Sequence, residues 1–139
     1  MLTDRSFVLA VSDEPAELFP LREELAGRLP DPFGEDEDAL LVAMLLVRQA
    51  QTWQGGSGPV RLRTTSLGEI VNFEVIRDVD EDADSGPTSL DAFHSMLRVL
   101  ADRSDRFTVS TFPGTVSLAA QKCAAPLSHE VGLDLRVAA

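Results

Sequence analysis

The 139-residue sequence has one cysteine, one tryptophan, two histidines and no tyrosine. Its only cysteine, Cys123, excludes a disulfide within the chain and fits a reducing compartment. The longest apolar run, Ala39 to Val47, is much shorter than the roughly 20 residues of a membrane-spanning helix. The first residues do not form a signal-peptide pattern before the acids at Asp13 and Glu14. We therefore expect a cytoplasmic protein without a membrane segment.

Basic residues are scarce. Twelve Lys and Arg stand against 23 Asp and Glu, which leaves a net charge of −11. Nucleic acids and anionic membrane surfaces both require clusters of Lys and Arg, so neither is an expected partner. Five acids occur in the seven positions from Asp78 to Asp84. Such a run is usually a solvated loop. The alternative is that Asp80, Glu81 and Asp82 bind a protein partner with a basic surface.

Apolar residues make up 44% of the chain, which is enough for a packed core in one domain. A short apolar run at 7–11 predicts a first strand. Two helices are expected next, over 15–29, where Pro20 should bend or restart the helix, and from 34–37 to about Trp53. Apolar residues on every side of the second helix's first turns predict that it is buried.

The second half of the chain predicts two hairpins and a helix. Residues 59–64 and 70–75 alternate apolar with polar side chains, as do 107–110 and 115–118. A helix from about residue 90 to 104 follows a Thr88–Asp91 capping-box pattern. Alternating strands have one wet face, so helices should cover only the other. We predict an α+β fold, a two-layer sandwich of an antiparallel or mixed sheet with about three helices on one face.

The last residues, 121–139, lie beyond this pattern, so we place the domain at 1–120. Val131, Leu133, Leu135 and Val137 alternate with other residues. The tail is therefore either an extra edge strand, on its own sheet or on another chain, or a disordered end.

Three segments carry a resemblance to a known family: Pro15 to Arg22, Leu40 to Trp53, and Leu100 to Leu118 with its Pro113-Gly114 turn. In this order and spacing they resemble the histidine-kinase-like ATPase fold, in the form found in bacterial anti-sigma-factor serine kinases. The resemblance covers about Phe7 to Ala120. It implies that the long helix faces a nucleotide.

The residues that the family uses for ATP are mostly replaced here. The resemblance places Leu45 where the catalytic Glu belongs and Gln49 where an Asn holds Mg²⁺. Leucine cannot accept a proton, and we expect Gln49 to be a surface amide rather than a ligand. Asp78 is the candidate for the adenine-binding carboxylate, although strict alternation turns Arg77 inward instead, so that Asp78 would need a β-bulge.

Three functions follow from these observations. The first is a non-catalytic regulatory pseudo-ATPase without a cofactor, which binds a protein such as a sigma factor or an anti-anti-sigma factor, or forms a homodimer. The second is a divergent kinase that uses ATP and Mg²⁺ through Gln49 and Asp78. The third is an acidic domain that binds divalent cations at residues 78–84. That loop lacks the glycine of a calcium loop, and no metal ligand set is expected.

Overall fold

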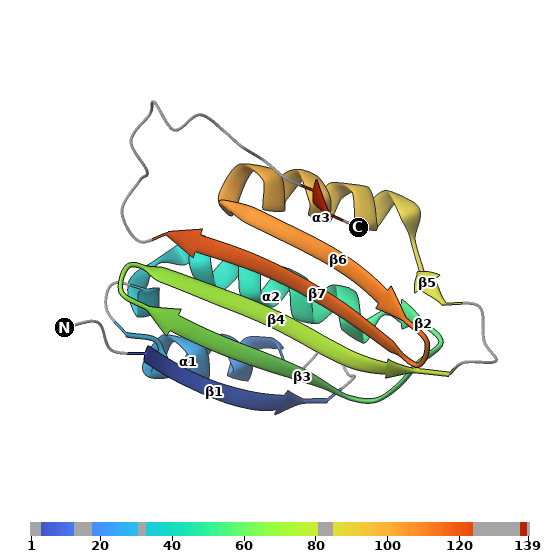
Figure 1. The fold of residues 1–139 in the computed structure, drawn as a ribbon, viewed down its shortest axis with the longest axis horizontal. Coiled ribbons are helices and arrows are strands. Elements are labelled where there is room, and N and C mark those ends of the chain that lie inside the picture. Colours follow the sequence, from blue (N-terminus) through green and yellow to red (C-terminus); the bar gives the residue numbers. More distant parts are fainter. Residues whose placement is uncertain (1–3, 13–17, 31–32, 81–84, 124–136, 139) are drawn as a thin grey trace.

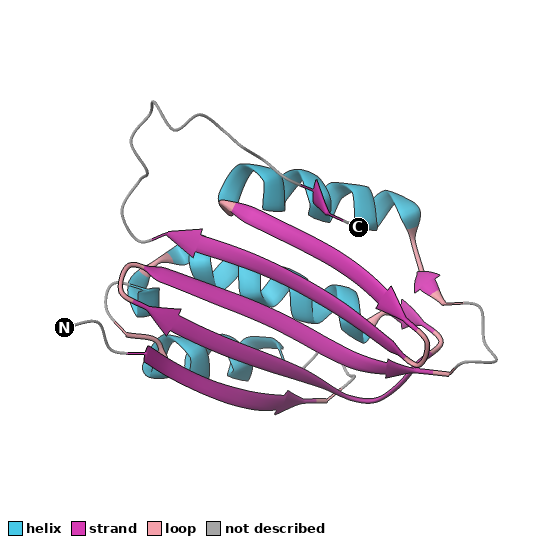
Figure 2. Cartoon of the chain, in the orientation of Figure 1, coloured by secondary structure: helices cyan, strands magenta, loops and turns pink. Residues whose placement is uncertain are grey.

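A computed structural model describes residues 4–12, 18–30, 33–80, 85–123 and 137–138. Six strands form one mostly antiparallel sheet in the order β1-β3-β4-β7-β6-β8. Helices α1, α2 and α3 lie on one face of this sheet (Figures 1 and 2). The predicted α+β class is thus confirmed, and the arrangement is consistent with the predicted two-layer sandwich.

The elements follow one another in nearly the predicted order. The helices are α1 (Leu18–Arg28), a 3₁₀ turn η2 (Phe33–Glu35), α2 (Glu37–Gln51) and α3 (Leu90–Arg103). The main strands are β1 (Asp4–Val11), β3 (Gly56–Leu67), β4 (Ile70–Val79), β6 (Arg106–Phe112) and β7 (Thr115–Cys123). Three two-residue strands were not predicted as such: β2 (Trp53–Gln54), β5 (Gly86–Pro87) and β8 (Val137–Ala138).

Alternation along the central strand β4 separates the two faces of the sheet. Val71, Phe73 and Val75 are fully buried beneath the helices, whereas Asn72 between them is exposed. The pairing of β4 with β7 runs without interruption from Ile70 to Asp78. Each face therefore keeps its own set of side chains along the whole strand.

Glycines close both hairpins. Gly68 has a φ of 60° at the first central position between β3 and β4, as in type II′ turns. Gly114 has a φ of 82° and follows Pro113 between β6 and β7, which is the residue order of a type II turn. Both turns require a backbone conformation that other residues rarely adopt.

Helix α2 is the central helix, and its predicted burial is confirmed: nine of its side chains are buried. Asp36 caps its start by accepting hydrogen bonds from the backbone N–H groups of Asp38 and Ala39. The helix was predicted to end at about Trp53, and it ends two residues earlier, at Gln51, with Thr52 as its cap. Trp53 instead enters β2 and pairs with Pro87 of β5.

Pro20 stands in the first turn of the described helix α1, where its missing N–H has no helical partner. Residues 15–17 of the predicted helix lie outside the described residues, so the predicted bend or restart at Pro20 stays a prediction. The capping prediction for α3 was wrong. Ser89, not Thr88, caps α3 through the backbone N–H of Ala92. The hydroxyl of Thr88 instead donates to the Thr52 carbonyl at the end of α2.

The end of the chain returns to the sheet. Val137 and Ala138 pair in parallel with Phe107 and Thr108 of β6 and form the edge strand β8. This is one of the two alternatives that the alternating tail predicts. Residues 131, 133 and 135 of that alternation lie outside the described residues.

Candidate functional site

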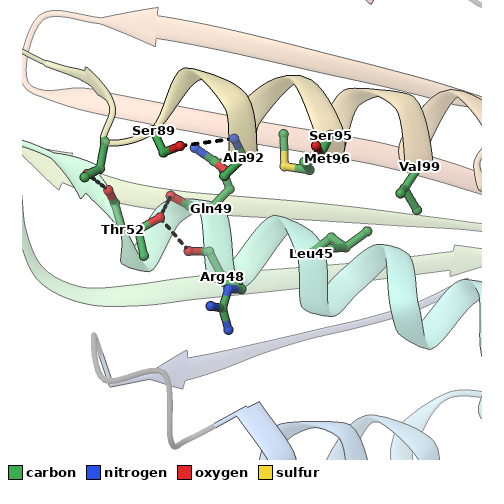
Figure 3. A pocket seen from close by; sticks show the side chains of 10 residues that line it. Leu45, Arg48, Gln49, Thr52, Ser89, Ala92, Ser95, Met96 and Val99 are labelled. Atoms are coloured by element: carbon green, nitrogen blue, oxygen red, sulfur yellow. Dashed lines mark hydrogen bonds between the residues drawn. The ribbon is translucent and has the colours of Figure 1, made fainter.

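A cavity of about 380 Å³ lies between α2 and α3, on the helix side of the sheet (Figure 3). We call it the α2–α3 cavity. On one side it is lined by Leu45, Arg48, Gln49 and Thr52. On the other side it is lined by Thr88, Ser89, Ala92, Ser95, Met96 and Val99. Its volume falls in the range of pockets that hold small molecules.

Contacts join the two helices at both of their ends. At one end the Thr88 hydroxyl donates to the carbonyl of Thr52, which joins the start of α3 to the end of α2. At the other end Arg103 Nη1 lies 2.6 Å from Asp38 Oδ1 and joins the end of α3 to the start of α2. The helices are therefore antiparallel, and the cavity lies between the last turns of α2 and the first turns of α3.

Leu45 and Gln49 both line the cavity, as their i, i+4 spacing on one helix face requires. Leu45 is half-buried and packs against the hydrophobic core with the part of its side chain that does not face the cavity. The prediction that Gln49 is a surface amide was wrong, because only 7% of the residue is exposed. Figure 3 shows its side chain reaching from α2 toward the first turn of α3.

Asp78 does not join Gln49. Its side chain is 66% exposed on the open face of the sheet, where it lies 3.3 Å from Arg61 Nη2. The β-bulge that would turn it inward is not present, because the β4–β7 register is continuous through Asp78. The irregularity in this region lies in β3, between Ser57 and Arg61. The sheet thus separates the two residues that the resemblance assigns to the nucleotide.

Arg77 takes the inward position, as strict alternation predicts, and is 4% exposed. Its Nη1 donates to the carbonyls of Ala50 and Gln51 at 2.8 and 2.9 Å, and its Nε donates to Gly58 O at 3.3 Å. The carbonyls at a helix end lack helical partners and carry partial negative charge. The guanidinium therefore acts as a buried cap for α2.

Trp53 is 5% exposed and is not among the residues that line the α2–α3 cavity. Its ring meets Phe93 edge to face, with centroids 6.2 Å apart, and its Nε1 donates to Ser85 Oγ at 2.8 Å. These are the contacts of a buried aromatic at the boundary between two helices. The ring packs the start of α3 against the end of α2 without filling the cavity.

The predicted partner-binding acids are only partly described. Asp80 is exposed, and its backbone N–H donates to Gly55 O. Together with Val79, Ser85 and the β6–β7 hairpin it lines a second hollow of about 420 Å³. Glu81 and Asp82 lie outside the described residues, as does most of the stretch compared with a calcium loop.

Cys123, at the end of β7, is partly buried. Burial raises the pKa of its thiol, and the neighbouring Asp105 carboxylate raises it further. The same carboxylate accepts the backbone N–H of Cys123 at 2.7 Å. The thiolate, which is the reactive form, is therefore disfavoured.

Among the described residues, no three His, Cys, Asp or Glu side chains are grouped so that they could hold a metal ion. Within the same part of the chain, no helix is both long enough and apolar enough to cross a membrane.

The residues of α3 that line the cavity were not predicted from the sequence as site residues. Ala92, Ser95, Met96 and Val99 recur at intervals of three and four, which places them on one helix face. Their small or apolar character was the available signal.

Comparisons with protein-family models and with curated proteins find no match for this chain.

Proposed function

We propose that this chain is a non-catalytic regulatory domain, related in fold to the anti-sigma-factor kinases, which binds a protein partner and does not use ATP. One observation carries the proposal. Gln49 lies on the helix side of the sheet, whereas the Asp78 carboxylate lies on the open side. One nucleotide cannot contact both.

The chemistry of the helix side supports the same conclusion. Leu45 lines the cavity at the position where the resemblance requires a carboxylate, and a leucine neither takes up a proton nor binds Mg²⁺. The inward position next to Asp78 holds Arg77, whose guanidinium donates to two carbonyls of α2. None of the described residues that line the cavity carries a carboxylate that could take the place of the adenine-binding one.

The surface that we assign to the partner combines acid with an exposed aromatic ring. Phe112, at the tip of the β6–β7 hairpin, is 60% exposed and lines the same hollow as Asp80. The hairpin is held to β4 by the Val79 N–H, which donates to Gly114 O at 2.9 Å. An exposed aromatic beside the acidic side chain of Asp80 suits a partner with apolar and basic side chains, such as a sigma factor or an anti-anti-sigma factor.

Titration with Mg-ATP tests the first half of the proposal. Trp53 is the only tryptophan, and it lies beside the Thr88 end of the cavity, so its emission reports ligand binding there. We expect no saturable change in emission and no rise in melting temperature up to about 1 mM Mg-ATP. A micromolar, saturable response that Gln49→Ala abolishes would establish the divergent kinase instead.

The second half is tested by calorimetric titration with a purified sigma factor and an anti-anti-sigma factor. We expect one of them to bind, more weakly at high salt, and both Asp80→Asn and Phe112→Ser to weaken the complex. Phe19→Ser is the matched control, because Phe19 is 70% exposed on α1. Equal losses from Phe112→Ser and Phe19→Ser would contradict the assigned surface.

A further inference from the structure

Gln49 stands out within the α2–α3 cavity because most of the residue is buried while its amide faces the cavity. The residue is 93% buried, and none of the described residues forms a hydrogen bond with its side-chain amide. The amide atoms are not among the fully enclosed polar atoms of the described residues, so they are open to a molecule that occupies the cavity. Its amide reaches toward Ser89 and Ala92, into the cavity (Figure 3).

The rest of the lining restricts what can meet this amide. Leu45, Met96 and Val99 provide apolar contacts farther along the two helices. Among the described residues that line the cavity, Arg48 alone is ionisable, and Figure 3 shows its guanidinium turned away from α3. An anion would meet no positive charge other than that of Arg48 and would approach a domain of net charge −11, while a cation would meet no acid among the described lining residues.

These features specify the ligand. We propose that the α2–α3 cavity binds a small neutral molecule with an apolar body and an amide-like edge, in which a carbonyl stands next to an N–H. The Gln49 side chain offers one acceptor and two donors, so it pairs with such an edge through two hydrogen bonds. The apolar body then lies against Leu45, Met96 and Val99, where its removal from water is favourable. This site does not depend on the protein partner proposed above.

Water is the competing occupant, because a cavity of about 380 Å³ has room for several water molecules that could satisfy the amide. The two kinds of occupant lead to different expected affinities for small probe molecules. A site that holds only water has the same affinity for molecules of equal size with or without an amide group. A site built for an amide-like edge discriminates between molecules of equal size that differ only in that group.

Benzamide, benzoate and toluene are suitable probes because they share one ring and differ in the attached group. We would titrate the ¹⁵N-labelled full-length protein with each and follow the side-chain amide signals of Gln49 and the backbone signals of Ala92 and Met96. Benzamide is expected to shift all three saturably, with an affinity at least about tenfold higher than that of benzoate or toluene. Equal responses to the three probes would overturn the proposal. So would the absence of any response to benzamide below about 20 mM, because a dissociation constant above that concentration corresponds to very weak binding.

Two variants distinguish the contribution of the Gln49 amide to probe binding from that of the cavity volume. Gln49→Leu removes the amide at similar size, and we expect benzamide to lose its advantage over toluene while toluene still binds. Gln54→Leu is the matched control, because Gln54 is exposed on β2 and is not part of the lining.

Ala92→Phe, at an exposed position of α3, fills the cavity and should abolish binding of both probes even if Gln49→Leu does not fold. Undiminished benzamide binding in Ala92→Phe would place the probe elsewhere and refute the assignment. Because neither ATP nor a protein partner is used, this outcome is independent of the proposed function.

Discussion

Arg77 and Asp78 are neighbours in sequence with opposite environments. Arg77 is buried beneath the helices and donates to the α2 carbonyls, whereas Asp78 is exposed and pairs with Arg61. Gly56 allows the β3 backbone to pass the buried guanidinium, since a Cβ at that position would stand 2.6 Å from Arg77 Nη1. Because side chains alternate along β4, the charged guanidinium of Arg77 points toward the helices, where carbonyl groups at the end of α2 accept its hydrogen bonds.

Replacing Arg77 is expected to be costly. Arg77→Met removes hydrogen bonds from a charged donor and leaves the carbonyls of Ala50 and Gln51 without it, so we expect a loss of about 2–4 kcal/mol in the free energy of unfolding. Urea denaturation would measure it. The control is Arg61→Met on the open face, which removes only a surface ion pair and should cost less than about 1 kcal/mol. Similar losses in both variants would show that Arg77 does not cap α2.

Cys123 leads to a prediction on pH. Because burial and Asp105 both raise the pKa of the thiol, iodoacetamide should modify Cys123 only at higher pH than it modifies a free cysteine. Asp105→Asn removes the negative charge, so it should lower the midpoint of the rate profile. The midpoint should stay above that of free cysteine, because burial is the larger cause. An unchanged midpoint in Asp105→Asn would exclude the carboxylate as a contributor.

At the scale of the element, the cap of α3 has two candidates that differ by one residue. In the structure Ser89 accepts from the Ala92 N–H, whereas the Thr88 hydroxyl contacts the end of α2. Ser89→Ala should therefore cost about 1 kcal/mol of stability. Ser95→Ala is the matched control, since Ser95 is exposed in the middle of the same helix and alanine favours helices there. Thermal denaturation of the two variants distinguishes the roles. A neutral Ser89→Ala would mean that the cap does not contribute to stability.

Local patterns predicted most of this architecture and little of the candidate site. Alternation in β4 placed Arg77 inward, and the apolar first turns of α2 indicated its burial, because both are properties of one element against one core. Gln49 was predicted to be exposed and is buried, because α3 packs across it. That contact joins residues more than 40 positions apart, and no pattern within α2 encodes it. For a similar reason α2 ends two residues before the predicted end near Trp53, since Trp53 pairs with Pro87 of a distant segment.

At the scale of the whole molecule, both proposed surfaces lie near one end of the sheet. The β6–β7 hairpin with Phe112, the start of α3 and the β2–β5 pair occur together there (Figure 1). Trp53 connects them, since it pairs with β5 and stacks edge to face on Phe93 of α3. A ligand in the α2–α3 cavity and a partner at the hairpin would therefore contact neighbouring elements, while the opposite hairpin at Gly68 would be remote from both.

The net charge of −11 leads to the last prediction, which concerns salt. Folding compresses 23 acids and 12 basic residues into a small volume, so the folded state gains more than the unfolded chain when salt screens their repulsion. Salt also weakens the exposed ion pairs, such as Arg22–Glu37 and Arg63–Glu74. Surface pairs of this kind contribute about 0–1 kcal/mol each and often nothing measurable, so relief of repulsion should dominate.

We therefore expect the melting temperature to rise between 20 mM and 500 mM NaCl. A gain of about 1 kcal/mol corresponds to a rise of roughly 3–5 °C for a chain of this size. Circular dichroism in NaCl and in choline chloride would measure it, and the two salts should act alike because screening depends on ionic strength rather than on the identity of the cation. A rise in NaCl alone would indicate specific cation binding by the acids, and a fall in both salts would show that the surface ion pairs outweigh the repulsion.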